Sequence, residues 1–107
     1  MPEYHRAAGV SDFSEGLVRV FKVNEVDIAI VNHEGAFYAF SGRCPHAGYY
    51  FNYTRVKPAD RIVCSSHMAL FDLKSGQVLG GPTNTSLCVY PVKVEGDDVL
   101  VSTEPAD

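Results

Sequence analysis

Two short runs, each with one cysteine and one histidine, constrain this chain more than any other feature. They are Cys44-Pro45-His46 and Cys64-Ser65-Ser66-His67, and residues 47–63 separate them. Within each run, a thiolate and an imidazole lie close enough in sequence for one loop to bind a single site through two atoms. Together the runs supply a Cys₂His₂ ligand set, so we expect them to converge on one metal centre.

The order of the four ligands differs from that of a zinc finger. A zinc finger segregates two cysteines in one turn and two histidines on a helix. Here each run carries one ligand of each kind, which suits a centre with two unlike ends. A structural zinc module is the alternative that the residue types leave open.

The pattern Cys-x-His followed by Cys-x-x-His resembles the Rieske family, and the resemblance extends over nearly the whole chain. It implies one [2Fe–2S] cluster per chain, with Cys44 and Cys64 on one iron and His46 and His67 on the other. It also implies an all-β fold, in which an antiparallel sandwich or barrel base carries a small cluster-binding subdomain.

The alternation of apolar and polar residues independently predicts an all-β domain. Turn residues separate the short strands, and a single helical turn capped by Ser11 is expected over residues 11–15. The stretch from Arg43 to about Pro82 lies between the earlier strands and the final hairpin, and is expected to form the subdomain. The expected strands cover residues 4–7, 17–23, 27–33, 36–41, 60–64, 69–72, 77–79, 88–95 and 99–103.

Length and composition predict one domain, residues 1–107, with a modest core and no room for a second active-site domain. Three cysteines, two of them already in the ligand runs, argue against a disulfide framework and fit a reducing compartment. Residues 1–6 contain no apolar segment of a signal peptide, and the sequence has no apolar run that could span a membrane. We therefore expect a cytoplasmic monomer with no membrane contact.

The formal net charge of −4 argues against nucleic-acid binding, which requires a basic face. An acidic surface would instead favour steering toward a basic protein partner.

Residues beside the ligands indicate which kind of Rieske protein the chain resembles. In respiratory-complex relatives, two further cysteines form a disulfide, and here those positions hold Tyr49 and Ser66. The same relatives place a serine and a tyrosine hydroxyl near the cluster sulfurs, where this chain has Ala69 and Phe71. With fewer donors to sulfur, the resemblance is to soluble Rieske-type ferredoxins of low reduction potential.

Several other residues receive structural expectations. Gly80-Gly81-Pro82 matches a family segment that shields the cluster, and residues 52–58 depart from relatives by lacking glycine. Met68 is expected either to pack or to belong to a docking patch, and Arg43 is either a surface charge or a contact for a partner carboxylate. Buried packing is expected for Phe51, Leu70, Phe71 and Cys88, and surface positions for His5 and His33.

The resemblance implies a one-electron carrier that takes electrons from a ferredoxin reductase and passes them to a terminal oxygenase. Its partners would dock at the tip formed by His46 and His67. An alternative is the small Rieske subunit of a larger oxidoreductase such as nitrite reductase. An oxygenase would need a second iron site of two histidines and a carboxylate, and outside the ligand runs only His5 and His33 remain.

Overall fold

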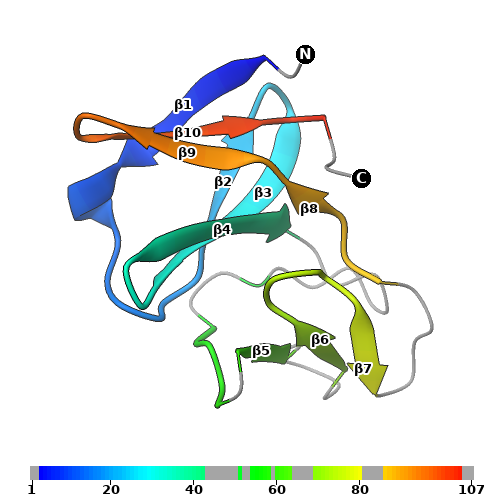
Figure 1. Cartoon of the computed structure of the whole chain (residues 1–107). Coiled ribbons are helices and arrows are strands. Elements are labelled where there is room, and N and C mark those ends of the chain that lie inside the picture. The colour runs from blue at the N-terminus through cyan, green and yellow to red at the C-terminus, as the bar shows by residue number, and fades with distance from the viewer. Residues whose placement is uncertain are drawn as a thin grey trace.

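The computed structural model describes residues 3–42, 51, 54–58, 60–63, 69–80 and 86–104. The described part of the chain is built from β-strands and one short 3₁₀ turn, so the all-β prediction is confirmed. It contains no helix long and apolar enough to cross a membrane. The elements are β1 (Tyr4–Gly9), η1 (Val10–Asp12), β2 (Arg19–Val23), β3 (Val26–His33), β4 (Ala36–Ser41), β5 (Arg61–Val63), β6 (Leu70–Asp72), β7 (Val78–Gly80), β8 (Val89–Tyr90), β9 (Val92–Glu95) and β10 (Asp98–Ser102) (Figure 1).

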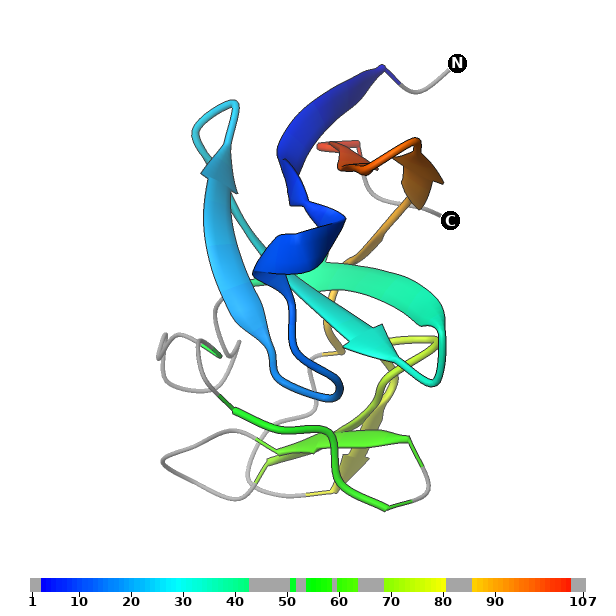
Figure 2. The same ribbon diagram turned by 90° about the vertical axis from the view of Figure 1, so that its left-hand side faces the viewer.

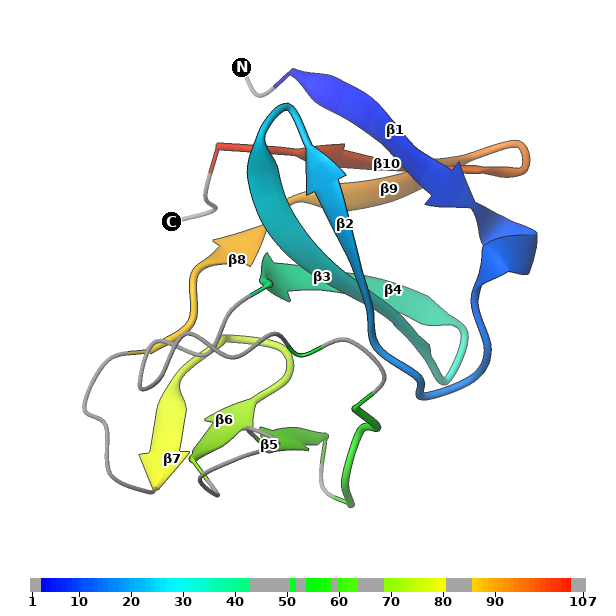
Figure 3. The ribbon, with the colours of Figure 1, turned by 180° about the vertical axis from the view of Figure 1, so that it is seen from behind.

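The strands form three antiparallel sheets. Their orders are β1-β10-β9, β2-β3-β4-β8 and β5-β6-β7. The four-stranded sheet lies between the other two, and the β5–β7 sheet occupies the end of the molecule away from β1 and β10 (Figures 1 and 2). The view from behind shows the same order (Figure 3). The first two sheets form the base, and the third is built from residues within the predicted subdomain.

Strand β3 explains why the middle sheet can carry a layer on each face. Successive side chains of a strand point to opposite faces. Ile28 and Ile30 pack with Val99 and Val101 of β10 in the first core, between the two sheets of the base. The residues between and after them, at 29 and 31, face the second core. Four consecutive buried residues in β3 are therefore expected from its central position.

The second core joins the base to the β5–β7 sheet. Fully buried aromatic rings and aliphatic side chains from both parts contact one another there. Its buried members are Val18, Ala29, Val31, Phe40, Phe51, Ile62, Ala69, Phe71, Leu73 and Leu87. Because this core draws on both parts, the small sheet is held to the base by apolar packing.

Tight turns join the strands of the middle sheet where the sequence predicts them. Asn24 and Glu25 have φ of 52° and 69°, and Glu34 and Gly35 have φ of 53° and 85°. Two consecutive residues with positive φ form the type I′ turn, whose twist matches that of the flanking strands.

The predicted helical turn is misplaced. The structure has a 3₁₀ turn over Val10–Asp12, one residue earlier than expected. Ser11 does not cap it. Instead, the Asp12 carboxylate accepts a hydrogen bond from the Gly9 amide at 2.9 Å, because its short side chain reaches back to the start of the turn.

The predicted strand over residues 88–95 is interrupted, and the prediction that Cys88 is buried is wrong. Pro91 has no amide hydrogen to donate, and it separates β8 from β9. Leu87 is buried in the second core, so the next side chain along the extended chain, Cys88, points outward and is exposed.

Gly76 is the point of closest backbone approach between the β6–β7 hairpin and the segment that enters β8. Its carbonyl accepts a hydrogen bond from the Leu87 amide at 2.7 Å. Its φ is +76°, and a Cβ at this position would lie 2.5 Å from the Leu87 carbonyl oxygen and 2.7 Å from Val89 Cγ2. Only glycine satisfies both the backbone conformation and the space.

We expect Gly76→Ala to destabilise the protein by about 3 kcal/mol, because it adds overpacking to an unfavourable φ. Gly35→Ala is the matched control, since Gly35 also has positive φ but open space around its Cβ direction. It should cost about 1 kcal/mol. Urea unfolding of both variants measures the difference, and equal losses would contradict the close-approach argument.

Candidate metal centre

The four predicted ligands, Cys44, His46, Cys64 and His67, lie outside the described residues. So do the neighbouring positions Arg43, Tyr49, Ser66, Met68 and Gly81-Pro82. The structure does describe the residues that flank each ligand-bearing stretch. The contacts of these flanking residues show how the two ends of each stretch are anchored.

The first ligand-bearing stretch, residues 43–50, has its two ends tied together. The Phe51 amide donates to the Gly42 carbonyl at 3.0 Å, and the Gly42 amide donates to the Asp27 carbonyl at 2.9 Å. A Cβ on Gly42 would lie 2.9 Å from Asp27 backbone atoms. The stretch therefore leaves the end of β4 and returns to it, anchored against the start of β3.

The second stretch, residues 64–68, and a third, residues 81–85, leave from one row of the β5–β7 sheet. Leu70 pairs with Val63 on one side and with Gly80 on the other. Val63 directly precedes Cys64, and Gly80 begins the Gly-Gly-Pro motif. The third stretch is closed at its far end because the Val78 amide donates to Ser86 Oγ at 3.0 Å.

Aromatic packing places Phe51, the residue that follows the first stretch, between β4 and the β5–β7 sheet. The ring of Phe51 contacts Phe71 edge to face, with centroids 6.1 Å apart. It contacts Phe40 of β4 in the same way, with centroids 5.5 Å apart. Since Phe71 follows Leu70, the end of the first stretch lies against the strand that receives the second. The expected burial of Phe51 and Phe71 is confirmed, and Leu70 is half-buried.

Ala69 and Phe71, the positions without hydroxyl groups, are both fully buried in the second core. Neither side chain can donate a hydrogen bond. Residue 69 directly follows the second stretch, and the Phe71 ring contacts Phe51. Thus the described residues beside the ligand runs provide apolar surface rather than donors.

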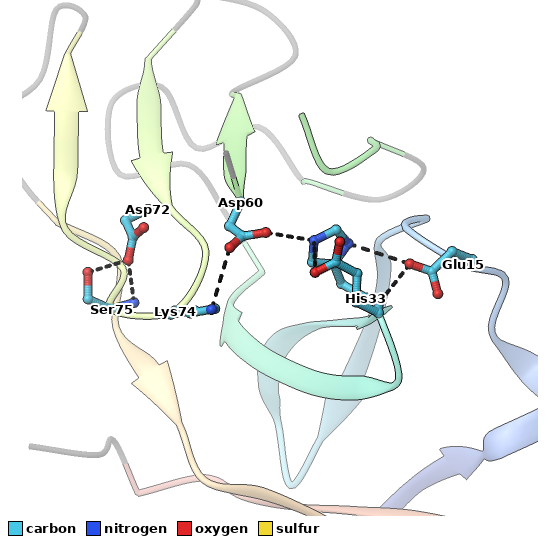
Figure 4. Close-up of polar contacts among 7 residues, drawn as sticks. Glu15, His33, Asp60, Asp72, Lys74 and Ser75 are labelled. Carbon is cyan, nitrogen blue, oxygen red and sulfur yellow. Dashed lines mark hydrogen bonds and ion pairs between the residues drawn. The ribbon is translucent and has the colours of Figure 1, made fainter. Parts of the chain in front are cut away.

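A polar network that sequence reasoning missed joins the base to the small sheet (Figure 4). The His33 side chain is only 16% exposed, so the prediction of a plain surface histidine is wrong for it. His33 Nε2 donates to Asp60 Oδ1 at 2.7 Å, while Nδ1 lies 3.5 Å from Glu15 Oε2. The nitrogen that faces the Asp60 carboxylate carries a hydrogen, because a carboxylate only accepts.

Asp60 connects three segments. Its side chain contacts His33 at the end of β3 and Lys74 Nζ, which is 3.5 Å from Oδ2, in the β6–β7 hairpin. Its carbonyl accepts from the Leu73 amide at 2.8 Å. The hydrogen bond from His33 holds the pKa of Asp60 below its ordinary value, and the charge of Lys74 lowers this pKa further.

Ligand atoms of His33, Glu34 and Asp60 lie within 4.8 Å of one another. Asp60 is already bonded to His33 and to Lys74, so hydrogen bonds and ion pairs account for this group. Residues 33 and 60 are far apart in sequence and have no shared spacing motif. For this reason the sequence carried no signal of the pair beyond the position of His33 next to a turn.

The two-sheet base, the small sheet, and the cysteine- and histidine-bearing stretches that follow β4 and β5 together point to an iron–sulfur class of protein. The family model described as Rieske [2Fe-2S] domain matches residues 3–91, and the chain belongs to this family. The chain therefore carries a [2Fe–2S] cluster.

Known relatives agree with this assignment. The ferredoxin component of the alkene monooxygenase system of Xanthobacter autotrophicus is 36% identical over 103 residues, which are 96% of this chain and 84% of the relative. The solved ferredoxin of carbazole 1,9a-dioxygenase from Nocardioides aromaticivorans is 26% identical with a TM-score of 0.85, covering 92% of this chain and 96% of that one.

A third similarity concerns the fold alone. A putative NADH-dependent nitrite reductase small subunit from Mycobacterium tuberculosis has a TM-score of 0.85 at 16% identity, covering 95% of this chain and 96% of that one. The backbone is thus shared by proteins with differently named roles, and shape by itself does not separate them.

The donor chemistry of the predicted ligands fits the group that the family binds. Two thiolates and two neutral imidazoles bring a [2Fe–2S] core with two ferric ions to formal neutrality, which suits a centre that accepts one electron. Phe51 and Ala69, which adjoin the two ligand-bearing stretches in sequence, are apolar and fully buried.

We expect a reduction potential near the bottom of the Rieske range, at about −150 mV, because Ala69 and Phe71 supply no hydroxyl donor. The double variant Ala69→Ser/Phe71→Tyr should raise the potential, since donors to cluster sulfur stabilise the reduced state. Protein-film voltammetry measures both values. A native potential well above zero would contradict the argument.

We expect His33→Ala to raise the pKa of Asp60 toward its ordinary value of 3.8, because it removes the hydrogen bond that contributes most to the shift. Lys74→Ala should raise it less. Carbon-detected NMR titration of the Asp60 carboxyl group in both variants measures which substitution raises its pKa more.

The sign of the pH effect on stability follows from the lowered pKa of Asp60. The contribution of this carboxylate is fully present above 3.8 and is lost as the pH falls through the folded-state value. The advantage of the native protein over Asp60→Asn in urea unfolding should therefore shrink on acidification. An advantage that grows would overturn the assignment.

Proposed function

We propose that this chain is a soluble, cytoplasmic, monomeric one-electron carrier that receives electrons from a reductase and delivers them to a terminal oxygenase. The observation that carries the proposal is its 36% identity, over 96% of its length, to a protein named as the ferredoxin component of a monooxygenase system. The match covers 96% of this chain and 84% of that relative, which supports a carrier of similar organisation.

We further propose that Cys44 and Cys64 bind one iron and that His46 and His67 bind the other. The described anchors support this assignment. The ends of the first stretch are tied at Gly42 and Phe51, and the second stretch spans the paired β5 and β6. Each stretch would then contribute one ligand to each iron.

Such a centre supplies reversible one-electron transfer, and the protein residues set its surroundings. Phe51, Ala69 and Phe71, which adjoin or lie near the ligand-bearing stretches in sequence, are buried together in the second core. The second core and the Asp60 contacts hold the small sheet against the base. A rigid scaffold limits the structural change that accompanies gain or loss of an electron, and electron exchange needs only a transient, small interface.

A role as the small subunit of a nitrite reductase is the second candidate. It is favoured by the fold similarity to such a subunit. The identity to that protein is 16%, against 36% to the monooxygenase ferredoxin component. Sequence similarity therefore supports the oxygenase-linked carrier.

Two other roles receive less support. An oxygenase needs a mononuclear iron site, and the described histidines outside the ligand runs do not provide one. His5 lies on β1 near Glu3, and His33 is bonded to Asp60. A structural zinc module would bind a colourless metal with no redox change, so metal analysis and the visible spectrum separate it from the proposal.

We expect Mössbauer spectra of the ⁵⁷Fe-labelled protein to resolve two unlike iron environments, because one iron would have sulfur ligands and the other nitrogen ligands in addition to the bridging sulfides. His46→Cys or His67→Cys should lower the reduction potential, since a thiolate adds negative charge. Cys88→Ser is the control, because Cys88 is exposed and lies outside both ligand runs. Equal iron environments in the native protein would rule out this ligand assignment.

A further inference from the structure

Charge is distributed unevenly between the two parts of this chain. Residues 43–82 contain five of the nine basic side chains and two of the thirteen acidic ones. The remainder therefore has four basic and eleven acidic side chains. The part that bears the ligand runs has a formal charge of +3 and the base has −7, although the whole chain is acidic at −4.

Three exposed cations of the ligand-bearing part lie on one face. Arg55 and Lys57 are two residues apart in an extended segment, so their side chains share a side. Between them, Val56 packs toward the second core. Lys57 forms an antiparallel bridge with Arg61 at the start of β5. We call Arg55, Lys57 and Arg61 the basic face.

The pairing of Lys57 with Arg61 places two like charges directly opposite each other. The Lys57 amide donates to the Arg61 carbonyl at 2.7 Å, and the Arg61 amide donates back at 3.2 Å. Directly opposite residues in such a pair have Cβ atoms about 5 Å apart, and like charges there are destabilising. The structure thus places two like charges opposite each other at an exposed position.

The carboxylates of the nearest acidic residues form their hydrogen bonds and ion pair with other partners. Asp60, in the turn between Lys57 and Arg61, directs its carboxylate to His33 and Lys74 (Figure 4). Asp72, opposite Arg61 in the β5–β6 register, accepts hydrogen bonds from the Ser75 amide and hydroxyl at 2.9 and 2.8 Å. In the described part of the chain, no carboxylate forms an ion pair with the three cations of the basic face.

The basic face includes the first residue of the strand that leads into the second ligand run. Strand β5 carries the chain from Arg61 to Val63, and Cys64 follows. Charges near an electron-transfer centre steer partners of opposite sign and orient them during the encounter.

We propose that Arg55, Lys57 and Arg61 form a docking face for a carboxylate-rich surface on a protein that exchanges electrons with this chain. The proposal rests on the carrier function proposed above, and it names the chemistry of the partner. The net charge alone predicted a basic partner, but that prediction averages two parts of opposite sign. Because the base is strongly negative, nucleic acid is disfavoured as the occupant.

The first test uses poly-L-glutamate as a carboxylate probe and the oxidised holoprotein. Amide NMR shifts should move at the basic face, and Lys57→Glu should weaken binding about tenfold at low salt. Lys22→Glu is the matched control, because it makes the same change of net charge at an exposed position on β2, a strand of the base. Equal weakening by both variants would overturn the proposal.

Tighter binding of a single-stranded DNA oligonucleotide than of poly-L-glutamate would overturn it in favour of nucleic acid.

The second test measures electron transfer with two cobalt(III) oxidants of opposite charge. In each reaction one electron leaves the reduced protein and converts cobalt(III) to cobalt(II). Arg61→Glu should slow oxidation by anionic [Co(EDTA)]⁻ several-fold and accelerate oxidation by cationic [Co(NH₃)₆]³⁺, with both effects vanishing in high salt. If the ratio of the two oxidation rates is the same in Arg61→Glu and in the native protein, and redox cycling is normal, the docking proposal is refuted while the carrier function stands. A protein that cannot be reduced and reoxidised at all would refute the carrier function instead.

A third measurement separates docking from a structural role. Replacing Lys57 by glutamate puts opposite charges across the bridge to Arg61, so Lys57→Glu should raise the melting temperature by about 2 °C while it weakens poly-L-glutamate binding. If Lys57 were retained for stability, the substitution would instead lower both the melting temperature and the affinity for poly-L-glutamate. A fall in the melting temperature together with intact binding would contradict the proposal.

Discussion

The burial of β3 on both faces is the constraint on which the rest of the molecule depends. Ile28 and Ile30 complete the core of the base, while the alternate residues of the same strand contribute to the core under the small sheet. A polar side chain buried on either face would weaken the packing of one of the two layers. The small sheet therefore packs on the face of the middle sheet opposite the first core. The stabilities of the base and of the small sheet are linked through β3.

Much of the fold could be predicted because its signals are local. The alternation of apolar and polar residues predicted the strands of the base, and turn residues such as Asn24 and Gly35 predicted its turns. The errors arise where tertiary contacts decide. Cys88 lies in an apolar run, yet it points outward because Leu87 occupies the core. Pro91 divides a strand that apolar character alone would have kept continuous.

The candidate site could be predicted from residue type and spacing, since cysteine and histidine in two paired runs have few chemical uses. The contacts that hold the small sheet to the base could not be predicted in this way. His33 and Asp60 meet only through the packing of β3 against the segment before β5. The basic face was likewise hidden, because net charge sums over residues that the fold separates, and because only the fold shows that Asp60 and Asp72 turn to other partners.

The pairing of β4 with β8 has a consequence for the order of assembly. Ala39 and Phe40 pair with Tyr90 and Val89, so the base closes across everything that lies between these strands, including both ligand runs. The entropy lost in closing such a segment grows only with the logarithm of its length. The two sheets of the base can therefore form while the intervening chain is still without metal. Folding of the base would then present the cysteines and histidines to incoming iron and sulfide on a chain whose ends are already fixed.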